Sequence, residues 1–161
     1  MKKISQAWGL DLMIAVMVFF SGIVVFYIYS INYSANQDDL ISKMINAGNL
    51  ISDSILSEGY PKNWSADNVA KIGILSSGKI NETKLERFYY LASGDYNKTK
   101  RIFNLKYDYY FFSDENFTIN SLQVEGIGKK PGDTENLVKV MRLAAYQEKP
   151  INIYVYIYEE K

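Results

Sequence analysis

The chain of 161 residues contains no cysteine and no histidine, has only three prolines and carries no net charge. Without cysteine there is no disulfide, no thiol nucleophile and no thiolate metal site. Without histidine the commonest general base, the Ser-His-Asp triad and the HExxH zinc site are excluded. A balanced charge provides no basic field for a phosphate backbone, so we expect no nucleic-acid partner.

The residue types that could still support catalysis form no recognisable constellation. Acidic residues are adjacent at 38–39, 114–115 and 159–160, but neighbours in sequence point apart on a helix or a strand. Gly126 and Gly128 lack the spacing of a phosphate-binding loop. The sequence therefore predicts no catalytic residue, no cofactor and no metal site, and a protein that is not an enzyme.

What the chain has in excess is one long apolar run, LMIAVMVFFSGIVVFYIY, from Leu12 to Tyr29. A helix of about 20 such residues crosses a hydrocarbon core of roughly 30 Å. Lys2 and Lys3 precede the run, and the next cation is Lys43. The positive-inside rule therefore places the amino terminus in the cytoplasm and the rest of the chain outside.

Three interpretations of this run compete. A secretory signal peptide has an apolar region of about 7–15 residues and a small-residue cleavage site, whereas this run is longer and is followed by Ile31-Asn32-Tyr33-Ser34. The second interpretation is a plain single-span anchor. The third is a pilin-type segment, in which a short basic leader is removed and the apolar helix is kept.

Asp11 stands at the start of the run, where a charge has to be explained. One explanation is that the helix dipole favours a carboxylate in the first turn. The other is a role in assembly. In an apolar bundle of helices the carboxylate needs a cationic partner, and the free amino terminus of a neighbouring subunit would supply one.

The helical pattern continues after the apolar run. Apolar residues recur at three- and four-residue spacings from Leu40 to Leu56, and Gly59 and Pro61 then provide a stop. We therefore predict one long helix from about residue 10 to residue 57. Its half within residues 6–33 suits a membrane or a filament core, and its amphipathic half begins an extracellular head of residues 34–161.

The head reads as an α+β fold, with the long hydrophobic helix packed on a small antiparallel sheet. Asn81 is a plausible cap for a helix over 82–91, and a second helix follows over 96–103. The turn residues at 113–116 and the loop at 130–133 separate the later strands. The predicted strands cover 71–75, 106–112, 117–125, 136–146 and 151–158.

The last strand alternates clearly between two faces. Ile151, Ile153, Val155 and Ile157 form an aliphatic face, which we expect to meet the long helix, and Tyr154, Tyr156 and Tyr158 lie opposite with Asn152. The tyrosine face has two interpretations. It is either a half-exposed face stabilised by cross-strand pairs, or a contact surface between subunits or for a glycan or another partner.

Five sequons, the N-x-S/T acceptor motif for N-glycosylation, follow the apolar run, where chance alone would give about 1.5. All five lie on the outer side of the predicted topology, which favours an externally displayed glycoprotein. The acceptors are Asn32, Asn63, Asn81, Asn97 and Asn116.

The amino-terminal sequence KKISQAWGLDLMIA, from Lys2 to Ala15, resembles the start of archaeal type IV pilin-like proteins with class III signal peptides. In these proteins a basic leader is followed by a small residue, Gln and the apolar helix. The segments GYPKNW at 59–64, KLERF at 84–88 and KYDY at 106–109 also look like stretches of uncharacterised archaeal surface proteins with this start. The resemblance covers most of the chain.

The resemblance implies removal of the leader, residues 1–5, by a prepilin-type peptidase that cuts between Ser5 and Gln6. A cut after Gln6 would instead make Asp11 the fifth mature residue, where pilins usually carry Glu. The mature chain would be a structural subunit of a surface filament, with copies of itself or other pilin-like subunits as partners and membrane lipid around it before assembly. The alternative is a monomeric, membrane-anchored extracellular binding protein or adhesin.

Overall fold

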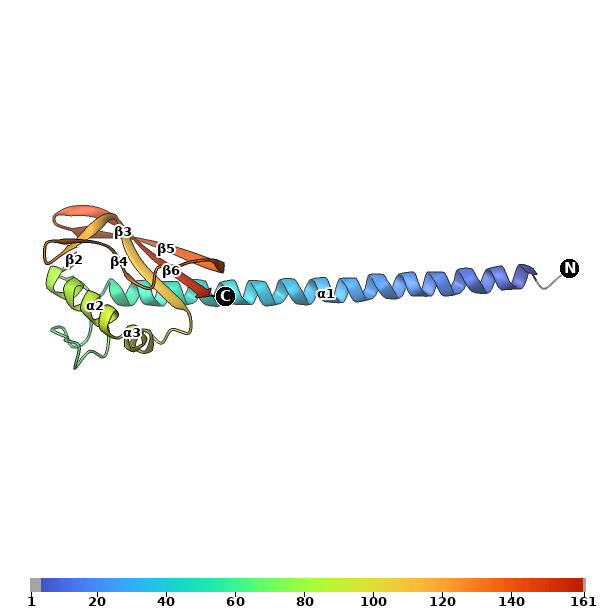
Figure 1. Cartoon of the computed structure of the whole chain (residues 1–161), viewed down its shortest axis with the longest axis horizontal. Helices are drawn as coiled ribbons and strands as arrows, with labels where there is room; N and C mark the ends of the chain where they lie inside the picture. Colours follow the sequence, from blue (N-terminus) through green and yellow to red (C-terminus); the bar gives the residue numbers. More distant parts are fainter. Residues whose placement is uncertain (1–3, 161) are drawn as a thin grey trace. The chain divides into compact units, whose positions relative to one another are not determined.

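The structure, a computed structural model, describes the backbone of residues 4–160 and the side chains of residues 9–31 and 39–160. The chain forms two compact units, Met1–Leu40 and Ile41–Lys161, which we call the N-terminal unit and the C-terminal unit and describe separately. Helix α1 (Ile4–Ile55) runs through the first unit and supplies the first element of the second (Figure 1). The predicted long helix is confirmed. Of the predicted leader, residues 1–3 lie outside the described residues.

The C-terminal unit is an α+β fold, as predicted, but its sheet is mixed rather than antiparallel. The six strands have the order β1-β2-β5-β6-β3-β4. Lys79 of β2 pairs in parallel with Ala145 of β5, and all the other pairs are antiparallel. The elements are β1 (Leu75–Ser76), β2 (Lys79–Ile80), α2 (Glu82–Gly94), α3 (Tyr96–Ile102), β3 (Asp108–Ile119), β4 (Leu122–Gly128), β5 (Thr134–Tyr146) and β6 (Lys149–Glu160).

The two short helices begin where side-chain caps fix them. The Asn81 side chain accepts a hydrogen bond from the backbone N–H of Lys84 at 3.0 Å, which confirms the predicted cap of α2. Asp95 ends α2 and caps α3 in the same way, through the N–H of Lys98 at 2.8 Å. Both caps satisfy N–H groups that a helix start leaves without an intrahelical partner.

The predicted turn at 113–116 is wrong, and so is the unbroken strand over 117–125. Strand β3 continues through the polar stretch as a bulge, because its register with β4 shifts between Phe112 and Phe117. The hairpin turn lies later, at Asn120 and Ser121, whose φ angles are 48° and 66°. Two successive residues with positive φ give the turn that matches the twist of a hairpin.

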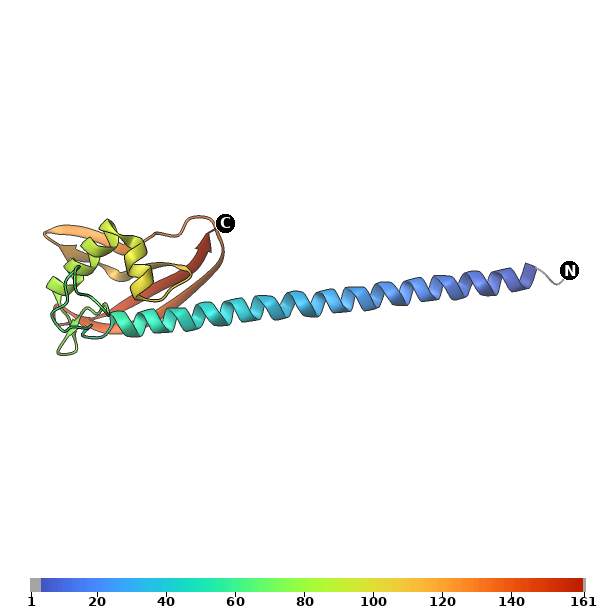
Figure 2. The same ribbon diagram turned by 90° about the horizontal axis from the view of Figure 1, so that it is seen from below.

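One face of the sheet, called the inner face, is covered by helices and forms the core (Figure 2). The last turns of α1 pack closely on this face at Gly48, where an added Cβ would lie 2.6 Å from Val140 and 3.4 Å from Ile157. The expected contact between the helix and the aliphatic face of β6 is therefore present. Phe88 of α2 packs on the same face, with ring centroids 6.4 Å from Tyr109 and 5.8 Å from Phe111.

The end of α1 is held by the segment that follows it. Trp64 is fully buried and its indole N–H donates to the carbonyl of Gly73 at 2.8 Å. The N–H groups of Ile74 and Leu75 bond the carbonyls of Ile55 and Ser57. Most of the segment 71–75, which was predicted as a strand, is therefore an irregular stretch that bonds to the end of α1 and the residues after it. Strand β1 begins only at Leu75.

Candidate functional site

The apolar stretch Gly9–Ile31 of α1 is long and apolar enough to cross a membrane, by length and composition. A signal sequence near the amino terminus would satisfy the same criterion. None of this stretch is buried within the structure, and the exposed fractions of its large apolar side chains run from 44% at Val16 to 73% at Phe26. A surface of this kind requires lipid or another protein around it.

Within the run Leu12–Tyr29 the clearly polar residue is Ser21, and it forms a hydrogen bond within its own helix. The hydroxyl of Ser21 donates to the carbonyl of Met17, four residues earlier, at 2.8 Å. A serine that bonds its own helix presents no unmet donor to hydrocarbon. The run Leu12–Tyr29 is therefore apolar around its whole circumference, whereas the helix over 41–55 is half-buried and has one apolar face.

The residues predicted for processing and assembly all lie at the start of α1. Asp11 is exposed and is the only charged residue within Gly9–Ile31. Ser5 and Gln6 have helical backbone, and their side chains lie outside the described residues, as does that of Asn32. Cleavage at Ser5–Gln6 and pairing of Asp11 therefore stay predictions.

The face of the sheet opposite the inner face, here called the outer face, carries a cluster of rings. Phe112 of β3 lies between Tyr154 and Tyr156 of β6, with ring centroids 5.1 and 4.8 Å away. The ammonium of Lys139 on β5 lies 4.0 Å from the centroid of the Tyr154 ring. Stacked and edge-on rings with a cation above them form a rigid, amphipathic surface.

Tyr158 does not share this exposed surface, contrary to the alternation of β6. Its side chain is fully buried and its hydroxyl donates to the carbonyl of Lys129 at 2.6 Å. The connection from β4 to β5 therefore covers this end of the outer face. Tyr154 and Tyr156 are only half-buried, so two of the three tyrosines expected on the exposed face lie there, beside Phe112, and its role as a contact surface stays a prediction.

Strand β5 extends the outer face with aliphatic side chains whose exposure the sequence analysis missed. The exposed fractions of Leu137, Met141 and Leu143 are 41%, 59% and 71%. Met141 pairs with Tyr154 and Leu143 with Asn152, so both lie on the side of the tyrosines. The signal was present, because these residues alternate with Val138, Val140 and Arg142 on the inner side.

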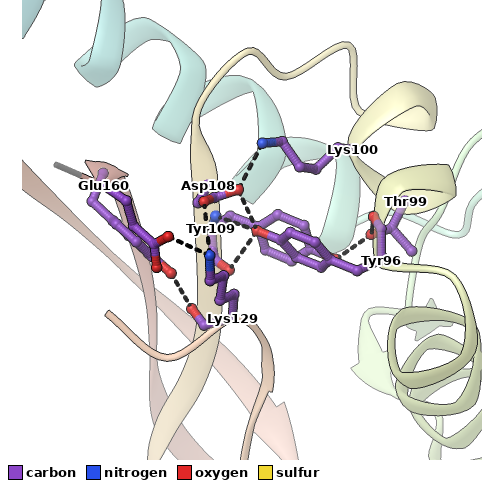
Figure 3. A network of polar contacts seen from close by, with 8 residues as sticks. Tyr96, Thr99, Lys100, Asp108, Tyr109, Lys129 and Glu160 are labelled. Carbon is purple, nitrogen blue, oxygen red and sulfur yellow. Dashed lines mark hydrogen bonds and ion pairs between the residues drawn. The ribbon is translucent and has the colours of Figure 1, made fainter. Parts of the chain in front are cut away.

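A polar network joins α3 to the end of the sheet at which β3 begins and β6 ends (Figure 3). The phenol of Tyr96 accepts from the N–H of Tyr109 at 2.9 Å and donates to Asp108 at 3.2 Å. Lys100 lies 2.6 Å from the same carboxylate. Lys129 bridges Asp108 and Glu160, so two cations meet two carboxylates.

The polar groups of this network satisfy one another. Its charges balance, and Thr99 satisfies the buried hydroxyl of Tyr109 at 2.6 Å. Among the described residues no buried side-chain N or O atom lacks a hydrogen-bond partner, and no group of three acidic residues is placed to hold a metal. The network therefore fixes α3 and the strand ends to one another.

The buried tyrosines predict a loss of stability at alkaline pH. Burial raises the pKa of Tyr96, Tyr109 and Tyr158 well above the ordinary value of about 10. A folded-state pKa above the unfolded one gives stability that is complete below the unfolded pKa and lost as the pH rises towards the folded one.

We therefore expect the thermal unfolding midpoint of the full chain in detergent to fall as the pH rises past about 10. The ultraviolet absorbance of tyrosinate from these residues should appear only together with unfolding. A Tyr158→Phe chain should show a shallower fall, because one of the three groups is gone. An unchanged midpoint up to about pH 11 would contradict the expectation.

The sequons differ in how the folded unit presents them. Asn63 lies exposed in a loop, and Asn116 lies exposed on the bulge of β3. Asn97 is exposed on α3, but its sequon partner Thr99 is fully buried. Asn81 is half-buried and serves as the cap of α2. The folded chain thus offers Asn63 and Asn116 most openly to a modifying enzyme.

Comparison of the chain with protein-family models, with curated proteins and with solved structures finds no match.

Proposed function

We propose that this protein is a structural subunit of a type IV pilus-like surface filament, assembled through its amino-terminal helix. The observation that carries the proposal is the stretch Gly9–Ile31, which has Asp11 as its one charged residue and apolar side chains that are exposed on all sides of the helix. The same helix α1 continues into the C-terminal unit and there packs on the sheet. A filament core of helices would bury the first part and display the second.

Assembly would proceed from the membrane. Lipid covers the apolar stretch of the newly made subunit, with the C-terminal unit outside the cell. A prepilin-type peptidase removes the basic leader between Ser5 and Gln6, and the new amino terminus pairs with Asp11 of a neighbour. Because lipid tails are as apolar as the helix, its packing with other helices relies on close van der Waals contact and on such polar pairs.

A membrane-anchored binding protein or adhesin remains the second candidate, and the outer face of the sheet favours it. Half-buried rings of Tyr154 and Tyr156 lie beside the exposed side chains of Met141 and Leu143. Clustered tyrosine and methionine are typical of interaction surfaces. In the filament proposal the same face would contact a neighbouring head, so the face alone does not separate the two functions.

Electron microscopy of fibres shed from the native cells tests the proposal. With an antibody against the C-terminal unit, we expect label along the fibre shaft in the wild type. An Asp11→Ala chain should remain in the membrane but lose most of its incorporation into fibres, whereas an Asp67→Ala control, at an exposed loop position, should assemble normally. Absence of the protein from every fibre, with the chain still in the membrane, would favour the anchored binding protein.

A further inference from the structure

A pocket of about 410 Å³ opens on the outer face, lined by residues of β3, β4 and β6 and by the loop after β4. It lies beside the bulge of β3, where the register with β4 shifts after Phe112. Gly126 shapes it from the other side, since a Cβ there would lie 2.5 Å from the ring of Tyr110. Glycine therefore lets the phenol ring of Tyr110 lie across β4, next to Phe112, with ring centroids 5.5 Å apart.

The bulge that borders the pocket is held in place by side-chain bonds. The carboxylate of Asp114 accepts from the backbone N–H of Asn152 at 3.1 Å and from its amide at 2.9 Å. The hydroxyl of Ser113 donates to the carbonyl of Glu115. These contacts fix the wall on which Asn116 stands, so the pocket is preorganised rather than formed on binding.

The lining of the pocket has the chemistry that recognises a sugar ring. The rings of Tyr110, Phe112 and Tyr156 line it, and aromatic rings suit the weakly positive C–H face of a pyranose. On the rim, Glu125 and Lys130 form an ion pair at 2.6 Å, with side chains that are 71% and 68% exposed. An exposed carboxylate and an ammonium are the acceptor and donor that sugar hydroxyls need.

Asn116 supplies the observation that identifies the source of the sugar. It lines this pocket, is exposed, and is the acceptor of the sequon Asn116-Phe117-Thr118. The side chain of Phe117 is fully buried in the core and so fixes the backbone next to Asn116. Thr118, the third residue of the sequon, is exposed. A sugar on the amide nitrogen of Asn116 would therefore start at the mouth of the pocket, within immediate reach of the rings.

We propose that Asn116 carries an N-linked glycan and that its first pyranose rings lie in the pocket between β3 and β4, on Phe112 and Tyr156. The glycan would cover part of the outer face and add its own contacts to the folded unit. The proposal rests only on that part of the proposed function which places the C-terminal unit outside the cell. It holds equally for a filament subunit and for an anchored binding protein.

The test compares full chains in detergent from two sources, native cells and a host without N-glycosylation. Glycopeptide mass spectrometry of native material should show sugar on Asn116. Thr118→Val removes the sequon and keeps Asn116, and it should lower the unfolding midpoint of native material by about 3 °C more than that of unglycosylated material. Ser65→Ala, which removes the sequon of Asn63, is the matched control and should show no such difference between the two sources.

A Phe112→Ala chain locates the sugar. Whatever this substitution costs the fold itself, it should abolish the difference in midpoint between glycosylated and unglycosylated material. A difference that survives in Phe112→Ala would overturn the placement in the pocket. The same holds if Asn116 is unmodified and unglycosylated chain binds free hexose at the pocket in an NMR titration, because the sugar then comes from another source.

The same test distinguishes failure of this proposal from failure of its assumption that the C-terminal unit lies outside the cell. Sugar on Asn63 without sugar on Asn116 would overturn the proposal alone. Native material without sugar on any sequon would overturn both the proposal and the support that glycosylation gives to an external C-terminal unit.

Discussion

A Gly73→Ala chain is expected to lose the folded C-terminal unit under conditions in which the wild type is stable. An added Cβ at residue 73 would overlap the backbone N of Gly59 and lie 2.5 Å from the carbonyl oxygen of Ser57. Both atoms belong to the backbone of the segment just after α1, so no flexible side chain can move aside. We expect a cost of about 3 kcal/mol or more, at the upper end for overpacking.

The cost is high at this position because several contacts depend on the same close approach. The carbonyl of Gly73 accepts the indole N–H of Trp64, and Ile74 bonds the last turn of α1 through the carbonyl of Ile55. Moving the segment to make room for a methyl group would break both bonds. Leaving the buried indole N–H without its acceptor adds a further penalty.

Circular dichroism melts of the full chain in detergent measure the effect. We expect the midpoint of Gly73→Ala to fall by roughly 10 °C or more. Gly132→Ala is the matched control, because nothing lies within 4 Å of a Cβ at that glycine and it should leave the midpoint unchanged. Equal midpoints for the two variants would show that the close packing at Gly73 is not needed for the fold.

The second large effect is expected in the apolar stretch of α1. Phe19 and Ile23 lie one turn apart near its middle, with exposed fractions of 65% and 46%. Replacing both by arginine costs about 2.5–3.5 kcal/mol for each charge at the centre of a membrane helix. The double variant therefore loses most of what drives insertion, and it also places two charges in any apolar bundle of helices.

Carbonate extraction of membranes measures this prediction. The wild type should remain in the membrane pellet, and the Phe19→Arg/Ile23→Arg chain should be absent from it. The control Phe19→Leu/Ile23→Leu keeps the apolar surface and should behave as the wild type. A double-arginine chain that resists extraction as the wild type does would mean that α1 is not what holds the protein in the membrane.

The elements that could be predicted are those determined by local chemistry. The cap at Asn81, the alternation of β6 and the stop after α1 each follow from a few neighbouring residues, and the structure contains all three. The predicted turn at 113–116 failed for a tertiary reason. Asp114 accepts a hydrogen bond from the side chain of Asn152 on β6. This contact holds the polar residues 113–116 in the sheet as a bulge of β3.

The outer face shows the same division between local and tertiary effects. The alternation of β6 predicted correctly that Tyr154 and Tyr156 lie on a partly exposed surface. Their neighbours are other strands of the same sheet, which leave this face uncovered. The alternation placed Tyr158 wrongly, since only the folded chain brings the carbonyl of Lys129 to the hydroxyl of this residue. The pocket at Asn116 could not be predicted either, because it depends on the register shift between β3 and β4.

The amino-terminal sequence of the mature protein from native cells tests the central claim most directly. The pilin-like account predicts a chain that begins at Gln6 or Ala7 and retains the whole stretch Gly9–Ile31. An intact Met1 would contradict leader removal and leave a plain anchor, and a start beyond Ile31 would show a secretory signal peptide.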